Sequence, residues 1–312
     1  MGIKFLGIVL LLVAGILGGG LWLRAELAEP DAPTQPVGMK IPPKIVKVIA
    51  PPPSPPAPVP EIVQQAPEPS PPPAAAPRRP DPAATPEKPV RIAIVIDDAG
   101  IDRKRTRRAI ALPAPLTLAF LVYGNDIAEQ TEAAAAAGHE LLVHVNMEAE
   151  SRAVDPGPKV LLRNVEPDIN LERLKWMLGR FEGYVGVNNH MGSKFTSDPE
   201  SMTLILTEIK RRNLLFLDSR TSPKTVGSKI SRSLGIPTAV RDVFLDNEPE
   251  LEAVRRNLAR TEAIARRTGA AIAIGHPRDA TLDALAAWLP AAKARGIQFV
   301  PVSALVSGAT SE

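Results

Sequence analysis

Residues 91–100 read RIAIVIDDAG, an apolar run that leads directly into two adjacent carboxylates, Asp97 and Asp98. A short apolar run without alternation is typical of a strand buried on both faces, as in a parallel sheet or barrel. α/β folds place their chemistry at the C-terminal ends of such strands. Neighbouring carboxylates repel each other, so the pair indicates a cation beside them. The alternative is a pair that caps the following helix.

Downstream of this run, strand-like and helix-like segments alternate. Further strands are expected at 116–123, 139–147, 184–188, 214–218, 237–240, 271–276 and 297–302. Helices are expected near 101–111, 126–137, 171–181, 199–212, 223–233, 251–269 and 279–289. This alternation predicts an α/β fold, with helices outside a parallel sheet. Seven or eight strands in about 215 residues suit a (β/α) barrel, complete or incomplete, better than an open sheet.

Upstream, the N-terminal residues 1–24 contain an uninterrupted apolar segment, Phe5 to Leu23. At about 1.5 Å per residue a helix of this length spans roughly 28 Å, close to the thickness of a bilayer core. It is either a cleaved signal or an uncleaved membrane anchor, and its length favours the anchor. Lys4 before it and the acidic residues after Arg24 favour an N-terminus inside the cell. We therefore expect a single pass through the inner membrane and a periplasmic domain.

Residues 25–90 are expected to be a disordered linker. Of the 34 prolines in the chain, 22 lie between Pro30 and Pro89. Proline tracts cannot donate a regular ladder of hydrogen bonds and favour extended polyproline II. The segment is interpreted as a semi-rigid spacer, with a peptide ligand for an envelope protein partner as the alternative. The barrel domain then covers 91–307, and 308–312 form a short tail.

The overall composition limits the partners and the metal ligands. A net charge of only +3 gives no support to nucleic-acid binding. The chain has no cysteine, so a metal ion would be held by histidine, aspartate or glutamate.

Polar residues recur at the C-terminal ends of the expected strands, and in a barrel these ends meet at one mouth. A carboxylate with two or more imidazoles suits a divalent metal, most simply Zn²⁺, with open positions for water. His139 begins its strand at the opposite end of the barrel and is interpreted as structural. The strand-end residues are Asp97 and Asp98, His144 with Glu148, Asn188 to His190, Asp218 and His276.

Five of these segments resemble the successive motifs of a known family. IVIDDAG, LLVHVNME, GVNNHMGSKFTSD, FLDSRTS and IGHPR are similar to those of the divergent polysaccharide deacetylase family, a branch of the NodB-like carbohydrate esterase superfamily. The resemblance covers about residues 91–305 and implies a distorted (β/α) barrel with a metal-assisted deacetylase site.

The resemblance also implies roles for individual residues. Asp97 matches the catalytic base, Asp98 and His144 match metal ligands, and His276 matches the acid that protonates the leaving group. The second histidine of the His-x-x-x-His motif is here Glu148. His190 is the expected replacement, with Glu148 as the alternative ligand.

Two further residues are expected to support this site. They are Asn189 and Asp218, the latter as a carboxylate that could hold the His276 ring and raise its pKa. The arginine-proline-tyrosine motif of typical members is not evident, and Asn146 stands where this branch has proline.

The function implied is a membrane-anchored, periplasmic, metal-dependent hydrolase that deacetylates an envelope polysaccharide such as peptidoglycan. The alternative is a catalytically inactive envelope module that keeps the barrel to bind glycan or protein. The altered motifs favour this alternative, whereas retention of both aspartates and three histidines favours the enzyme.

Overall fold

The computed structural model describes residues 89–113 and 115–306. The predicted anchor (1–24), nearly all of the predicted linker (25–90) and the tail (308–312) lie outside these ranges. None of the helices in the described ranges combines the length and the apolar character needed to cross a membrane.

Strands and helices alternate along the described part of the chain, as the sequence predicts. The strands are β1 (Val90–Ala99), β2 (Thr117–Leu121), β3 (Glu140–Met147), β4 (Gly186–Met191), β5 (Leu215–Asp218), β6 (Thr238–Val240), β7 (Val243–Phe244), β8 (Ala270–Gly275) and β9 (Ile297–Phe299). The helices are α1 (Arg103–Ile110), α2 (Ile127–Ala136), α3 (Pro167–Leu178), α4 (Pro199–Arg211), α5 (Gly227–Ser233), α6 (Leu251–Thr268) and α7 (Asp279–Ala294), with 3₁₀ turns at Phe195–Ser197 and Val302–Leu305.

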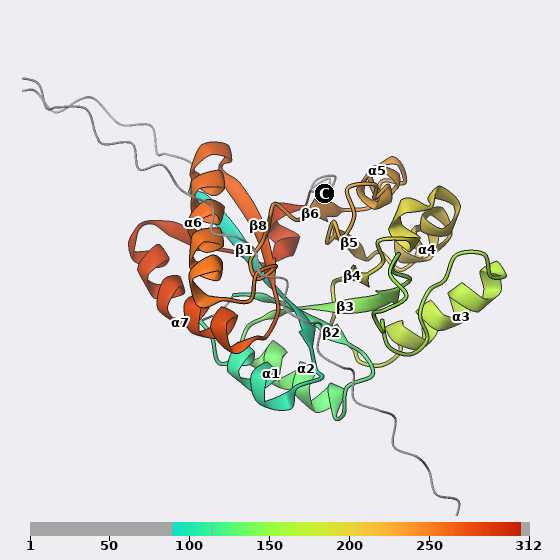
Figure 1. The fold of residues 1–312 in the computed structure, drawn as a ribbon, viewed down its shortest axis with the longest axis horizontal. Helices are drawn as coiled ribbons and strands as arrows, with labels where there is room; N and C mark the ends of the chain where they lie inside the picture. Colours follow the sequence, from blue (N-terminus) through green and yellow to red (C-terminus); the bar gives the residue numbers. More distant parts are fainter. Residues whose placement is uncertain (1–88, 114, 307–312) are drawn as a thin grey trace, which may run out of the picture. The chain divides into compact units, whose positions relative to one another are not determined.

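All strand pairs in the sheet are parallel. The strand order is β6-β5-β4-β3-β2-β1-β8-β7, and β9 pairs with the start of β1. Within the described residues β6 and β7 do not pair, so the sheet curls without closing. The helices lie outside it (Figure 1). The expected parallel sheet with outer helices is confirmed, and the barrel is incomplete.

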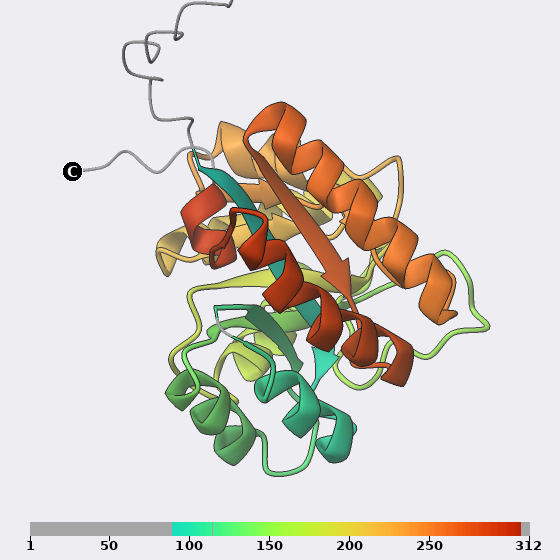
Figure 2. The same ribbon diagram turned by 90° about the vertical axis from the view of Figure 1, so that its left-hand side faces the viewer.

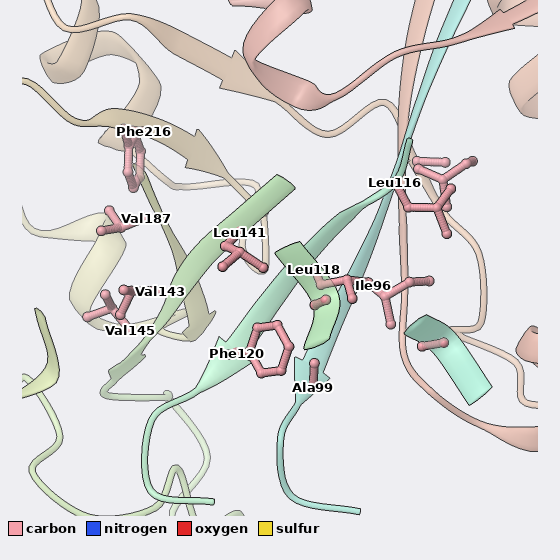
Figure 3. Packing of buried hydrophobic residues seen from close by; sticks show 14 of the residues in the cluster. Ile96, Ala99, Leu116, Leu118, Phe120, Leu141, Val143, Val145, Val187 and Phe216 are labelled. Atoms are coloured by element: carbon pink, nitrogen blue, oxygen red, sulfur yellow. The ribbon is translucent and has the colours of Figure 1, made fainter. Parts of the chain in front are cut away.

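Each face of the sheet has its own core, because side chains alternate along a strand. The outer face packs against the helices through large residues such as Ile96, Phe120 and Val143 (Figure 3). The inner face is lined by a smaller cluster that includes Ala93, Val95 and five further alanines or leucines of β2, β3, β5 and β6. Burial of β1 on both faces is therefore confirmed, and it leaves only the strand ends for polar groups.

The ends of β1 and β8 lie side by side (Figure 2). Ile96, the last residue of β1 before the two aspartates, pairs with Gly275 at the end of β8. Asn146 near the end of β3 pairs with His190 of β4. The parallel register thus brings the predicted site residues to one end of the sheet.

Several elements differ from those predicted. β4 continues to Met191, so Asn189 and His190 lie within the strand rather than after it. The two-residue strand β7 was not predicted. α7 continues through Pro290 to Ala294. The missing proline N–H would have bonded the carbonyl of Ala286, and both residues are exposed, so water can replace that bond.

Candidate metal centre and active site

A break in the regular strand turns both aspartates of β1 toward the mouth of the sheet. Ala93 and Val95 face inward, so Asp97 follows them inward by alternation. Asp98 would then point outward, but its φ is 56° and the register with β2 shifts between Ile96 and Ala99. This bulge keeps two successive carboxylates at one site. Neither caps the following helix, because Asp102 is the N-cap of α1.

Asp98, His144 and His190, the metal ligands expected from the sequence, lie together in a group that could hold a metal ion. One ligand atom from each lies within 4.8 Å of the others. Asp98 Oδ1 is 2.9 Å from His190 Nδ1 and 3.3 Å from His144 Nε2. That oxygen is buried and has no hydrogen bond of acceptable geometry. One carboxylate and two imidazoles around an unsatisfied oxygen fit a divalent cation such as Zn²⁺, with room for further ligands.

Asn188 fixes the orientation of the side chains of Asp97 and His144. Its Nδ2 donates to Asp97 Oδ1 at 2.7 Å and to Ser219 Oγ at 3.1 Å. Its Oδ1 therefore faces His144 Nδ1, at 2.7 Å. Because that oxygen can only accept, His144 carries a proton on Nδ1 and presents Nε2 to Asp98. An outer hydrogen bond of this kind is the usual way to hold a metal-binding histidine.

His276 is held on the other side of Asp98 by Asp246. Asp246 Oδ1 lies 2.9 Å from His276 Nδ1, and its Oδ2 accepts from the His276 backbone N–H and the Thr281 hydroxyl, both at 2.8 Å. His276 Nε2 then faces the site, 3.7 Å from Asp98 Oδ2. The arrangement leaves one ring nitrogen free to donate a proton to a bound molecule.

The charges in the site favour a positive ion or proton between the carboxylates. Burial acts to raise the pKa of Asp98, but His144 and His190 outweigh it and hold that pKa far below its usual range. Burial raises the pKa of Asp97. For His276, burial lowers the pKa, but the Asp246 carboxylate outweighs it, so the net shift is upward.

Glu148 is not part of the metal group. It forms an ion pair with Lys194, Oε1 to Nζ 2.6 Å, and accepts from the Arg163 backbone N–H at 2.9 Å. It stands one residue beyond β3, where the chain leaves the sheet. The alternative that Glu148 completes the metal site therefore disagrees with the structure.

Asp218 does not hold His276, contrary to expectation. It shares the outer face of β5 with Phe216 and accepts from Thr225 Oγ1 and the Ser228 N–H, both at 3.0 Å, on the way into α5. Asn189, on the outward side of β4, accepts from the Ser219 N–H at 2.9 Å. Both residues support the loop after β5 rather than the reacting groups.

His139 has the structural role predicted for it. Its Nδ1 accepts from the Leu116 N–H at 3.2 Å, so its Nε2 must donate to the Ile110 carbonyl at 2.9 Å. It is buried at the opposite end of β3 from His144.

Two residues of the site were missed. The sequence predicts Asn189 as a supporting residue, whereas strand alternation places Asn188 on the same face as His190. Asp246 follows the unpredicted β7 in the sequence VFLD, which repeats the pattern of an apolar run ending in a carboxylate. This repeated pattern is the feature of the sequence that could have predicted Asp246 as a site residue.

These residues line a cavity of about 470 Å³ at the mouth of the sheet. Asp97, Asp98 and the three histidines His144, His190 and His276 form one side of it. The rest is formed by Asn189, Met191, Ser219, Arg220, Thr221, Arg241, Phe244, Asn247, Ile274 and Arg278.

Comparison with known proteins agrees with the resemblance of the motifs. The family profile described as divergent polysaccharide deacetylase matches residues 94–306. An uncharacterized protein of Haemophilus influenzae is 34% identical over 199 residues, which cover 64% of this chain and 71% of that protein. The uncharacterized protein YibQ of Escherichia coli is 35% identical over 196 residues, 62% of this chain and 61% of its own length.

A solved structure shows the same fold. The crystal structure of the uncharacterized protein ATU2773 from Agrobacterium tumefaciens C58 superposes with a TM-score of 0.68 at 32% identity, and the match covers 72% of this chain and 92% of that one. Since the family profile spans well over half of the sequence, this chain belongs to the divergent polysaccharide deacetylase family.

Proposed function

We propose that this protein is a metal-dependent hydrolase that removes acetyl groups from an envelope polysaccharide, with peptidoglycan as the nearest candidate. The observation that carries the proposal is that His144 and His190 both lie beside the buried, unsatisfied Oδ1 of Asp98. Asp97, beside Asp98 on β1, and His276, directly after β8, flank that point. Family membership supplies the acetyl substrate, and the geometry supplies a separate residue for each chemical task.

Metal binding, proton removal and proton donation are assigned to different side chains of the site. Asp98, His144 and His190 would hold a divalent cation, which acts as a Lewis acid toward a carbonyl group and lowers the pKa of water. Asp97, anchored through one oxygen by Asn188, takes the proton of the attacking water with the other. His276 donates a proton from Nε2 to the leaving nitrogen or oxygen, while Asp246 holds the ring.

We further propose that the domain is tethered to the inner membrane and faces the periplasm. The apolar run Phe5 to Leu23 and the proline-rich residues 25–90 support this location. A spacer of this composition would let the domain reach polymer in the cell wall.

The test is acetate release by the purified full chain from N-acetylated peptidoglycan fragments and chitooligosaccharides, with and without zinc. Asp98→Asn, His144→Ala and His190→Ala should each lower bound zinc, measured by elemental analysis. Asp97→Asn should keep the zinc and lose about 10²–10⁴-fold in turnover, as for a lost general base. Glu148→Gln is the matched control and should keep its zinc.

Two outcomes would reject the proposal. If His144→Ala and His190→Ala both keep their full zinc content, these residues do not form the metal site. Zinc binding without acetate release from any of these glycans would favour the non-catalytic binding module.

A further inference from the structure

Three arginines also line the metal cavity. They are Arg220 after β5, Arg241 after β6 and Arg278 after β8. In the described part of the chain none of the three guanidinium groups forms an ion pair with a carboxylate. Arg278 donates to the Asp246 backbone carbonyl at 2.6 Å. Among the described residues, the Arg220 guanidinium forms no hydrogen bond. In the described residues these guanidinium groups thus lack a direct ion pair, although Asp97, Asp218 and Asp242 lie close enough to Arg241 to act on its charge.

Arg241 is built into the wall of this cavity. Its Nε donates to the Ser219 carbonyl at 2.6 Å, and its Nη2 donates to the Arg220 carbonyl at 2.9 Å. Its guanidinium also lies 5.0 Å from the centre of the Phe244 ring. Burial and the nearby charge of Arg220 lower the pKa of Arg241. Asp97, Asp218 and Asp242 act in the opposite direction, and a bound anion would add to their effect.

Arg220 is aimed by its backbone. Its φ is 50°, in the left-handed region that arginine seldom adopts. Asp218 stabilises this turn by accepting from the Arg220 N–H at 3.0 Å, and Arg241 binds the Arg220 carbonyl from the other side. Strained backbone of this kind, fixed by its neighbours, is typical of ligand-binding positions.

The arginines also connect the metal cavity to a second hollow. Arg220, Arg241, Phe244 and Asn247 border both the first cavity and a neighbouring one of about 490 Å³. The second hollow is also lined by Arg260 and by the acidic residues Asp242 and Glu248. A substrate with its acetyl group beside Asp98 would therefore place its next substituent or sugar unit against the arginines.

We infer that these arginines bind an anionic group of the glycan, a carboxylate or a phosphate, next to the acetylated sugar. Guanidinium groups bind both anions through paired, charge-assisted hydrogen bonds. The inference rests on the proposed deacetylase function and narrows its substrate class to acidic polysaccharides. Arg220 and Arg278 supply free donors, and Arg241 positions the loop that carries Arg220.

The test measures binding apart from catalysis. Metal-free full-length protein is titrated by calorimetry with three disaccharides: diacetylchitobiose, its 6-phosphate, and N-acetylglucosaminyl-N-acetylmuramic acid, which carries a carboxylate. At least one acidic sugar should bind about tenfold or more tightly than the neutral one. The preference should shrink as salt is raised, because screening weakens exposed charges.

Arg220→Gln and the double variant with Arg278→Gln should remove the preference. Arg267→Gln, at an exposed position near the end of α6, should keep it. Since the Arg220 guanidinium makes no polar contact within the described residues, its replacement should leave the melting temperature unchanged. Equal binding of neutral and acidic sugars, or a preference that survives both arginine variants, overturns the inference.

Acetate release by the zinc-loaded protein separates this inference from the proposed function. Release from neutral and acidic sugars with equal KM rejects the anion site and keeps the deacetylase. An arginine-dependent preference without release from any sugar rejects the deacetylase and leaves an acidic-glycan binding site. The better of the two acidic ligands identifies the anion as carboxylate or phosphate.

Discussion

Asp246 and Asp218 are both buried aspartates at strand ends, yet only Asp246 contacts a residue of the proposed mechanism. Asp246→Asn should keep bound zinc and lower kcat by about 10²-fold or more, because the His276 ring loses the partner that fixes its tautomer and orientation. Asp246 also raises the pKa of His276. A general acid with a lowered pKa loses its proton sooner, so the alkaline limb of the kcat profile should move to lower pH.

Asp218→Asn is the matched control for that prediction. It should lower the melting temperature through the loop after β5 without moving the alkaline limb. A profile that stays in place in Asp246→Asn, or shifts equally in both variants, would mean that Asp246 does not tune His276.

The prediction for His139 concerns stability rather than activity. Burial lowers its pKa from the ordinary value of 6.5, and the fold holds it neutral between the Leu116 N–H and the Ile110 carbonyl. The unfolded chain then binds a proton that the folded chain does not, so His139 lowers stability as pH falls below about 6.5. In His139→Gln the melting temperature should be lower at pH 7.5 and fall less between pH 7.5 and 5. An identical pH dependence in both proteins, followed by calorimetry, would contradict this role.

At the scale of one element, the end of β1 depends on the left-handed conformation of Asp98. Left-handed backbone costs an ordinary residue about 1–2 kcal/mol and glycine little. Asp98→Gly should therefore be more stable than Asp98→Ala by about 1 kcal/mol, although both lose the carboxylate. Denaturant unfolding gives the comparison. At Asp97, where φ is not positive, the order should reverse. Alanine equal to glycine at Asp98 would mean that the bulge relaxes when the carboxylate is removed.

At the scale of the whole molecule, the described domain should be independent of the preceding residues. Since β1 begins at Val90, a chain of residues 89–312 keeps every described element. Its melting temperature should match that of the full chain, because a proline-rich spacer buries little apolar surface. A chain that starts at residue 97 loses most of β1 and should not fold.

Localisation is tested separately. A reporter fused after residue 90 should be exported and remain with the membrane fraction if Phe5 to Leu23 is an anchor. Recovery of a mature soluble protein that begins near residue 25–30 would identify a cleaved signal instead.

The sequence by itself determined the alternation of strands and helices, the buried first strand, and the strand ends that carry Asp98, His144, His190 and His276. These features are local, because side-chain periodicity and the position of a polar residue at a strand end depend on a few neighbouring residues. The same local patterns carry the motifs that identify the family. They also separate His139, at the start of its strand, from the histidines at the mouth.

Only the tertiary structure decided which polar residues contact one another. Asn188 rather than Asn189 contacts the site residues because Asn188 lies on the inward face of β4. The predicted strand ended at residue 188, so the alternation of faces beyond that residue was not apparent. Asp246 rather than Asp218 reaches His276 because a two-residue strand too short to detect pairs beside β8. Hydrogen bonds between strands depend on register and on a bulge at Asp98, and both are set by packing across the sheet rather than by the spacing of residues along the chain.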